Sequence, residues 1–354
     1  MTSRARTPTP LRTASPGGHA RRRIPAIAAL LATVVVMAAL GGCGDTDVTT
    51  RGTPDPDRNG GDQFVPVSTT PAAEATPVLP VEIDGADGRS VNVTDVDRII
   101  ALNGNITELV FALGLGERVV GRDISTTFDE AAELPLVTRA HDVSAESVLS
   151  LRPTIVLADT DTGPPEALEQ IRNVGVPVVV FDAPTGIDDI SDRIRSVAEA
   201  LGVRNTGVEL ARTTEAQIEQ AADRVDDEGP PSRIAFLYMR GQAGVYLLGG
   251  EGSGMDSMID ALGATDAGTE LGLDRPFTPI TSEALVRAAP DVILMTTTGL
   301  ESVGGIDGLA AIPGIAQTPA GRDRRVITVE DGLLYSFGTR TPEAIAQIAA
   351  GLEQ

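Results

Sequence analysis

Histidine and tyrosine are the residue types in this sequence whose side chains bind ferric iron well, and both are scarce. The chain contains two histidines and three tyrosines, with one cysteine and no tryptophan. His141 lies just ahead of Ser144, in a segment typical of a loop, and Tyr238 lies near the end of the apolar segment 234–239. Imidazole and phenolate groups both serve as axial ligands of protein-bound iron. We therefore take His141 and Tyr238 as candidate iron ligands.

Arg240 follows Tyr238 by two positions, so on a strand both side chains point to the same side of the sheet. A guanidinium beside the phenol oxygen would favour the phenolate, the form that binds Fe(III). Arg240 could instead bind a carboxylate of the ligand in a bidentate manner, or form a surface ion pair. Without an iron ligand role, His141 would be a solvated loop residue and Tyr238 a core residue, and the residues alone leave these alternatives open.

Three further side chains are candidates for the wall of the same site. Met295, at the end of the apolar segment 291–295, could offer soft apolar surface or approach iron weakly, or belong to the core. Tyr246 and Tyr335 are pocket candidates. A zinc or manganese site needs several histidines and carboxylates, and only one histidine follows residue 43. We recognise no nucleophile–base pair and no phosphate-binding glycine loop with its lysine, which favours a binding protein over an enzyme.

The N-terminal segment 1–43 has the layout of a secretory signal. It contains six arginines and no acidic residue, then an apolar run at 24–40 broken only by Thr33, then Leu-Gly-Gly-Cys ending at Cys43. Small residues before the single cysteine resemble a bacterial lipobox, with Cys43 as the acylated N-terminus. The alternative is a permanent membrane helix, for which this run is at the short limit. We expect a protein on the extracytoplasmic face of the cell membrane, attached only through its lipid.

Beyond this signal the chain is strongly acidic. Removal of the six arginines leaves 22 basic residues, all arginine, against 50 acidic ones, a balance of about −28. Such a surface argues against nucleic acid or an anionic membrane as the partner. Residues 44–79 are rich in Thr, Pro, Asp, Gly and Ala, which predicts a flexible linker.

From residue 80 onward, short apolar strands alternate with helical patterns, which is typical of an α/β fold. We expect strands at 98–102, 154–158, 176–181, 234–239, 244–248, 291–295 and 325–329. The pattern predicts an N-terminal lobe at 80–186 and a C-terminal lobe at 229–354, both Rossmann-like with parallel sheets. A long rigid helix within 187–228 is expected to join them.

A faint internal repeat supports two related lobes. Segments 144–153 and 281–290 each precede a predicted strand, and each places a glutamate seven residues before a proline. These glutamates are Glu146 and Glu283. A glutamate in the first turn of a helix also has an ordinary explanation in the helix dipole.

Several segments resemble the ABC-importer binding proteins of the helical-backbone class, which carry haem, cobalamin or ferric siderophores. They are Asn-Ile-Thr-Glu-Leu-Val at 105–110 running to Gly-Leu-Gly-Glu at 114–117, and Leu-Arg-Pro-Thr-Ile-Val-Leu at 151–157. Gly-Leu-Glu-Ser-Val-Gly-Gly at 299–305, Ile-Pro-Gly at 312–314 and Phe-Gly-Thr-Arg-Thr-Pro-Glu at 337–343 look specifically like the haem-binding lipoproteins of haem importers. The resemblance covers nearly all of residues 90–354.

This resemblance implies a haem carrier with two α/β lobes linked by one helix and with the ligand in the cleft between the lobes. It implies His141 and Tyr238 as axial ligands of a transported haem b, with Arg240 tuning the tyrosine or binding a propionate. It also implies that Glu146 and Glu283 dock onto arginines of the permease dimer of an ABC haem importer. The alternative within the same class is a ferric-siderophore or cobalamin binding protein.

Overall fold

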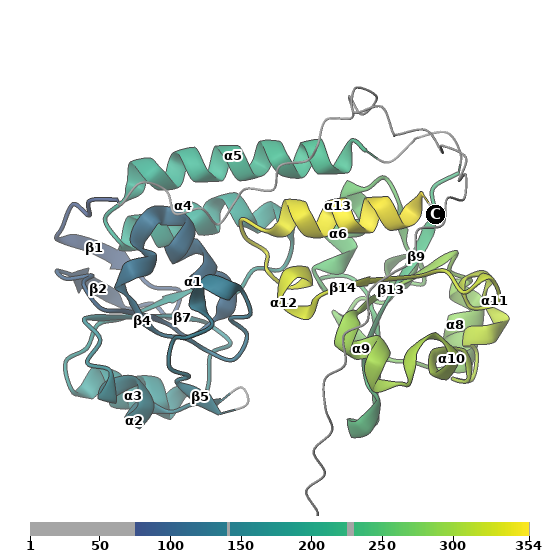
Figure 1. Ribbon diagram of the computed structural model, residues 1–354, viewed down its shortest axis with the longest axis horizontal. Coiled ribbons are helices and arrows are strands. Elements are labelled where there is room, and N and C mark those ends of the chain that lie inside the picture. Colours follow the sequence, from purple (N-terminus) through teal and green to yellow (C-terminus); the bar gives the residue numbers. More distant parts are fainter. Residues whose placement is uncertain (1–74, 140–141, 225–229, 354) are drawn as a thin grey trace, which may run out of the picture. The chain divides into compact units, whose positions relative to one another are not determined.

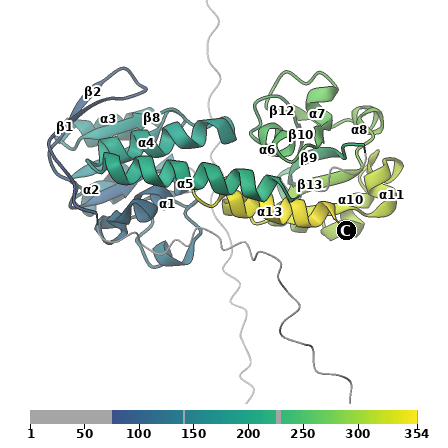
Figure 2. The same ribbon diagram turned by 90° about the horizontal axis from the view of Figure 1, so that it is seen from above.

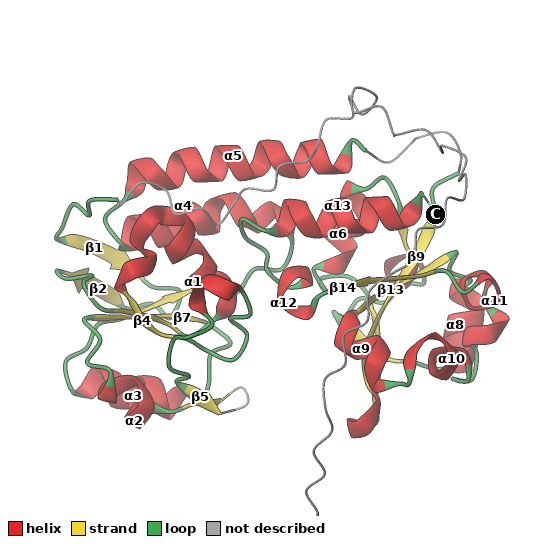
Figure 3. Ribbon diagram, viewed as in Figure 1, coloured by secondary structure: helices red, strands yellow, loops and turns green. Residues whose placement is uncertain are grey.

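The computed structural model describes residues 75–139, 142–224 and 230–353, all of which lie within one compact unit. They form two α/β lobes with helices joining them, coloured by sequence in Figure 1 and by element type in Figure 3. The predicted signal segment with Cys43 lies outside the described residues, as do linker residues 44–74 and His141. The predicted fold class, α/β with two lobes, is confirmed.

The N-terminal lobe is built on a four-stranded sheet in the order β4-β3-β7-β8, and every pairing in it is parallel. Its strands are β3 (Ile99–Ala101), β4 (Val119–Gly121), β7 (Ile155–Asp159) and β8 (Val178–Phe181). Two antiparallel hairpins flank it, formed by β1 (Val81–Asp84) with β2 (Ser90–Val93) and by β5 (Thr138–Arg139) with β6 (Asp142–Val143). Its helices are α1 (Gly104–Val110), η1 (Phe111–Leu115), η2 (Gly116–Arg118), η3 (Asp129–Ala131), α2 (Ala145–Ser150) and α3 (Pro165–Asn173).

The C-terminal lobe has a six-stranded sheet in the order β12-β10-β9-β13-β14, with β11 also paired to β9. Its strands are β9 (Arg233–Arg240), β10 (Val245–Gly249), β11 (Thr265–Asp266), β12 (Phe277–Pro279), β13 (Val292–Thr296) and β14 (Val326–Val329). The expectation of parallel pairing holds for β9, β11, β13 and β14 but not for β10, which runs antiparallel to both β9 and β12. Only the short turn η5 (Gly241–Ala243) links β9 to β10, and a parallel pairing would need a long crossover.

The remaining helices of the C-terminal lobe are short apart from the last one. They are α6 (Met255–Ala261), α7 (Ala267–Glu270), α8 (Ser282–Ala288), α9 (Thr297–Ser302), α10 (Gly305–Ala310), η6 (Ile315–Gln317), α11 (Pro319–Asp323), α12 (Asp331–Leu334) and α13 (Thr341–Leu352).

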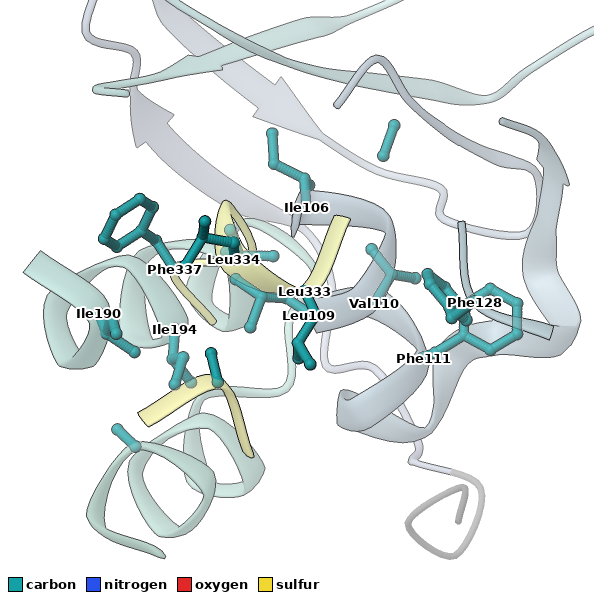
Figure 4. Packing of buried hydrophobic residues seen from close by; sticks show 14 of the residues in the cluster. Ile106, Leu109, Val110, Phe111, Phe128, Ile190, Ile194, Leu333, Leu334 and Phe337 are labelled. Carbon is teal, nitrogen blue, oxygen red and sulfur yellow. The ribbon is translucent and has the colours of Figure 1, made fainter. Parts of the chain in front are cut away.

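One hydrophobic cluster, which we call the shared cluster, contains buried side chains from both lobes. Ile106 and Leu109 of α1 lie in it with Leu333 and Leu334 of α12 and with Phe337, as Figure 4 shows. Burial of large apolar side chains contributes about 2 kcal/mol each. The lobes are therefore joined by packing as well as by the chain.

The central strands alternate their side chains between the shared cluster and a second cluster on the outer face of each sheet. In β9, Ile234 and Phe236 belong to the shared cluster, whereas Ala235 and Leu237 belong to the outer cluster of the C-terminal lobe. This is the period-two pattern of a strand with both faces covered. It determines which side chains of β9 lie on the face that packs against the shared cluster.

The internal repeat seen in the sequence is present in the structure as a repeated capping motif. Ser144 accepts a hydrogen bond from the backbone N–H of Ser147 at the start of α2, and Thr281 accepts one from Ala284 at the start of α8. These caps satisfy backbone donors that a helix leaves unpaired at its N-terminus.

An arginine completes the motif in each lobe. Arg98 Nη2 donates to the carbonyl of Leu151 at 2.6 Å, and Arg233 Nη2 donates to the carbonyl of Ala288 at 2.8 Å. Each arginine therefore ties the C-terminal end of the repeated helix to a central strand of its lobe. The two lobes share one local design.

The predicted connecting segment 187–228 contains two helices, of which the second is the long one. The turn η4 (Ile187–Asp189) leads into α4 (Ile190–Ala200), and α5 (Arg204–Ala222) follows. Gly202 ends α4 with a φ of 72°, a conformation that glycine adopts without strain. α5 contacts η1 of the N-terminal lobe and α13 of the C-terminal lobe, and Figures 1 and 2 show it running from one lobe to the other. At 1.5 Å per residue α5 is about 28 Å long.

Candidate ligand-binding site

Tyr238 lies near the end of β9, and its ring packs against the shared cluster. Its neighbours on the strand, Leu237 and Met239, are fully buried in the outer cluster on the opposite face. Tyr238 itself is only partly buried. The phenol thus lies on the face of the C-terminal sheet that packs against the shared cluster, at the end of the strand.

Arg240 folds back over Tyr238. The guanidinium carbon lies 4.6 Å from the centroid of the Tyr238 ring. Nη1 donates to the carbonyl of Met239 at 2.9 Å, and Nη2 donates to Oδ1 of Asp331 at 2.9 Å. The sequence predicted a guanidinium on the same side as the phenol, and the structure adds that it stacks on the ring face while paired with a carboxylate. A cation over an aromatic face is attracted by the ring electrons.

A row of aromatic rings continues from Tyr238 along this face. The ring centroids of Tyr238 and Phe277 are 5.8 Å apart, those of Phe277 and Phe236 are 6.2 Å apart, and those of Phe236 and Tyr335 are 6.2 Å apart. Tilted and edge-to-face pairs at these distances are favourable. Phe236 is fully buried, so the row anchors Tyr238 in the core, and Tyr238 and Phe277 are partly exposed at its end.

The hydroxyl of Tyr335 is buried, and among the described residues it has no hydrogen-bond partner. Burial and the nearby Tyr238 raise the pKa of this phenol, against the opposing effect of Arg240. Tyr335 therefore stays protonated in this position. It is a neutral donor beside the Tyr238–Arg240 pair.

Met295 and Tyr246 do not join this group of side chains. Met295 is fully buried in the outer cluster, directly opposite Leu237 in the β9–β13 register. Tyr246 also packs against the outer cluster and lines a separate pocket of about 630 Å³ with Val303 and Ile312. Both side chains point away from the face that carries Tyr238, so we leave them out of the binding site. Tyr335 remains in it.

His141 lies outside the described residues, but the strands on either side of it are described. β5 and β6 pair with Arg139 opposite Asp142. β6 is followed directly by Ser144, the cap of α2. The backbone next to His141 is thus held by a hairpin and a capped helix.

A group of polar side chains at the end of β7 in the N-terminal lobe is paired internally, although Arg193 Nε has no hydrogen-bond partner among the described residues. Arg193 of α4 pairs with Asp159 at 2.6 Å and also donates to Asn105 at 2.7 Å. Burial raises the pKa of Asp159 to about 6 even though Arg193 acts to lower it. These side chains fasten β7 to α4 and α1. Within the described residues no group of three or more His, Cys, Asp or Glu is arranged to hold a metal ion.

Glu146 and Glu283 occupy equivalent, exposed positions. Glu146 lies in the first turn of α2 and Glu283 in the first turn of α8, each one position after the first helical residue. Both side chains are solvent-exposed. The capping motif that repeats between the lobes therefore presents one free carboxylate on each lobe.

Sequence reasoning missed three residues of the site: Phe236, Phe277 and Asp331. Phe236 precedes Tyr238 by two positions, so the strand period was a usable signal for it. Asp331 is 91 residues from Arg240, and nothing in the sequence around it distinguishes it from other acidic residues.

A comparison of the sequence with known protein families identifies the family to which this two-lobed chain belongs. The model of the family described as periplasmic binding protein matches residues 99–332. The chain belongs to the periplasmic binding protein family. Its members bind ligands rather than transform them, which agrees with a site made of one phenol, one guanidinium and a row of rings.

Two solved structures are similar to this chain over most of their length. The crystal structure of the haem-binding protein HmuT shares 39% of its residues with the chain at a TM-score of 0.75, covering 81% of this chain and 93% of that one. The apo form of the periplasmic haem-binding protein RhuT from Roseiflexus sp. RS-1 shares 43% at a TM-score of 0.69, covering 73% and 98%. The resemblance inferred from the sequence, to haem-binding proteins of this type, is confirmed.

Curated relatives extend the comparison at lower identity. The ABC transporter substrate-binding lipoprotein YvrC of Bacillus subtilis strain 168 is 25% identical over 291 residues, which cover 79% of this chain and 88% of the relative. The vitamin B12-binding protein of Pectobacterium carotovorum subsp. carotovorum strain PC1 is 25% identical over 258 residues, covering 72% and 88%. Within the described part of the chain, no helix is both long and apolar enough to span a membrane.

Proposed function

We propose that this protein captures haem outside the cytoplasm and delivers it to an ABC importer. Haem b is the cargo, and Tyr238 and His141 take the two axial positions on its iron. The observation that carries the proposal is the arrangement at the end of β9, where a partly buried phenol lies under a guanidinium at 4.6 Å and beside a row of aromatic rings. Imidazole and phenolate groups both serve as axial ligands of haem iron.

The solved relatives support the same assignment. HmuT has been crystallised as three single alanine variants, at an arginine, a histidine and a tyrosine, and its tyrosine and arginine are two positions apart. Tyr238 and Arg240 have the same spacing, and the chain has a single histidine beyond residue 43, His141. We infer that these three residues form the haem-binding set.

The remaining parts of the proposal concern delivery. Cys43 carries the lipid that holds the protein at the outer face of the cell membrane. The exposed carboxylates of Glu146 and Glu283 contact the permease dimer, one from each lobe. The protein acts by binding and release, without catalysis.

The test is a hemin titration of the purified full chain in mild detergent, followed by visible absorption. We expect a saturable one-to-one Soret shift that is lost in His141→Ala and in Tyr238→Ala. A titration without a Soret shift contradicts haem binding. Retention of cyanocobalamin or of a ferric siderophore by the same preparation would then support the alternative cargo, which the similarity to a vitamin B12-binding protein makes the natural second candidate.

A further inference from the structure

The hydroxyl of Tyr335 is an unpaired hydrogen-bond donor in a buried place. Within the described part of the chain, its oxygen is buried and has no hydrogen-bond partner. A polar group buried in this way lowers the stability of the unloaded protein, because it has left water without forming a hydrogen bond in the protein. Phenylalanine at this position would keep the ring and avoid that cost. A ligand that brings an acceptor to the hydroxyl would recover it.

The ring of Tyr335 is held in place by its surroundings. Its backbone N–H donates to the carbonyl of Asp331 at 3.2 Å, at the end of α12. Its ring centroid lies 6.2 Å from that of Phe236 with the two planes at 75°, an edge-to-face pair. The preceding residue, Leu334, is fully buried, and Tyr335 itself packs against the shared cluster. The packing that fixes the ring thus leaves its hydroxyl without an acceptor.

The neighbours of the Tyr335 phenol place it at the candidate binding site. Burial raises the pKa of this phenol, and of the charged or ionisable side chains nearby, Tyr238 and Asp331 raise it further while Arg240 lowers it. Such effects need short distances, so the phenol lies close to the end of β9. Tyr238 is partly exposed, and the side chain of Arg240 is 34% exposed. Exposed side chains change rotamer readily, so these two can move aside for a ligand.

Arg240, the other donor at this place, is already engaged within the protein. Its Nη1 donates to the Met239 carbonyl at 2.9 Å and to Thr296 Oγ1 at 3.5 Å. Its Nη2 donates to Asp331 Oδ1 at 2.9 Å. A bidentate contact from Arg240 to a ligand carboxylate, one of the alternatives left open by the sequence, would require these contacts to break. The Tyr335 hydroxyl has none to break, so it meets an anionic oxygen of a ligand at lower cost.

We propose that Tyr335 binds a carboxylate of the cargo, its hydroxyl donating a hydrogen bond to one carboxylate oxygen once the ligand has entered the site. The inference rests on the proposed function, because haem is an apolar ring that carries propionate carboxylates. A single neutral donor holds a carboxylate less tightly than a bidentate guanidinium does. Such a contact orients the cargo and still suits a protein that must release it.

The test combines one substitution with two ligands. Tyr335→Phe removes the hydroxyl and keeps the ring contact with Phe236, so the variant should fold. Tyr246→Phe is the matched control, because Tyr246 packs against the outer cluster and lines a separate pocket. The ligands are hemin and hemin dimethyl ester, in which the carboxylates are blocked. Each affinity is compared with that of the unaltered full chain in the same mild detergent, so that partitioning of the ligand into detergent cancels.

We expect Tyr335→Phe to lower hemin affinity and to raise stability. Hemin affinity should fall about tenfold, the size of one hydrogen bond to a charged group, whereas affinity for the dimethyl ester should match that of the unaltered chain. The melting temperature of the unloaded variant should rise by about 2–4 °C, because an unpaired buried hydroxyl has been removed. A residue with only a structural role would not combine weaker binding with higher stability. Tyr246→Phe should change neither affinity.

Equal weakening of hemin and dimethyl ester binding in Tyr335→Phe overturns the carboxylate contact. A melting temperature that does not rise shows that the hydroxyl has a partner before the ligand binds, which overturns it too. If the unaltered chain binds hemin and not the ester, the loss of hemin affinity in Tyr335→Phe decides. If hemin binds equally well to Tyr335→Phe and to the unaltered chain, the inference fails and the haem function stands. If the unaltered chain binds neither porphyrin, the haem function fails and the inference with it.

Discussion

Glu108 of the N-terminal lobe accepts a hydrogen bond of 2.8 Å from the hydroxyl of Thr339 in the C-terminal lobe. The same carboxylate oxygen accepts a second one, of 2.9 Å, from the Arg340 backbone N–H at the start of α13. Glu108 is only 2% exposed. A buried carboxylate thus joins the lobes beside the shared cluster and α5. The lobes are therefore connected by the Glu108 hydrogen bonds, by the packed shared cluster and by the helix α5. Because of these three connections, we predict that the lobes move little relative to one another when a ligand binds.

The stability contribution of Glu108 should depend on pH with a definite sign. Burial raises the pKa of Glu108, outweighing the hydrogen bonds that lower it. Its folded state therefore holds a proton more tightly than the unfolded chain. The resulting contribution to the free energy of unfolding is complete below the unfolded pKa, about 4.3, and is lost as pH rises through the folded pKa. Denaturant unfolding from about pH 4 to pH 8 should show Glu108→Gln gaining stability relative to the unaltered chain as pH rises.

Glu215→Gln, at an exposed position of α5, is the matched control and should show no such trend. Glu108→Ala should lose about 3 kcal/mol, since it leaves a hydroxyl and an N–H unpaired in a buried place. If the free energy of unfolding of Glu108→Gln differed from that of the unaltered chain by the same amount at every pH, the pKa of Glu108 would be the same in the folded and unfolded states.

Gly207 sets how closely α4 and α5 pack. A Cβ at this position would lie 2.2 Å from the Cβ of Ala198, so Gly207→Ala must push the two helices apart. We expect a net loss of about 1–2 kcal/mol, because overpacking outweighs the better helix propensity of alanine. Chemical denaturation measures this loss, and Gln220→Ala, an exposed position in the same helix, serves as control. Equal or higher stability of Gly207→Ala would mean that α5 can shift freely.

Tyr238→Phe should separate packing from iron ligation. Phenylalanine keeps the ring contact with Phe277 at 5.8 Å and removes only the phenol oxygen. The melting temperature should therefore change by no more than a few degrees, while hemin affinity falls at least tenfold, about 1.4 kcal/mol. The Soret band should shift as the iron loses its phenolate. An unchanged spectrum together with unchanged affinity would place Tyr238 in a structural role only.

Charge reversal at the exposed glutamates should affect delivery and spare binding. Glu146→Arg and Glu283→Arg would each replace the proposed attraction to permease arginines by a repulsion, so haem uptake by cells should fall for each and further for both. Hemin titration of the purified variants should match the unaltered chain. Glu301→Arg, an exposed glutamate on α9, is the control. Full uptake by the double variant would rule out docking through these two residues.

The sequence by itself determined where the central strands and the repeated helices lie, and which side chains share one face of a strand. Apolar runs located β3, β7, β8, β9, β13 and β14, because buried strands of an α/β fold must be apolar on both faces. The period of two placed Tyr238 and Arg240 on one side of a strand. The repeated Ser/Thr-x-Glu segments located α2 and α8, because a helix needs a cap whatever surrounds it.

Only the tertiary structure decided which of those faces meets which partner. A strand pattern shows that Met295 is buried, but cross-strand register places it opposite Leu237 and away from Tyr238. Arg240 finds Asp331 across 91 residues, and Glu108 finds Thr339 across 231. Such pairs leave little trace in local sequence, because the energy of each contact depends on distance and burial that exist only once the lobes have packed together.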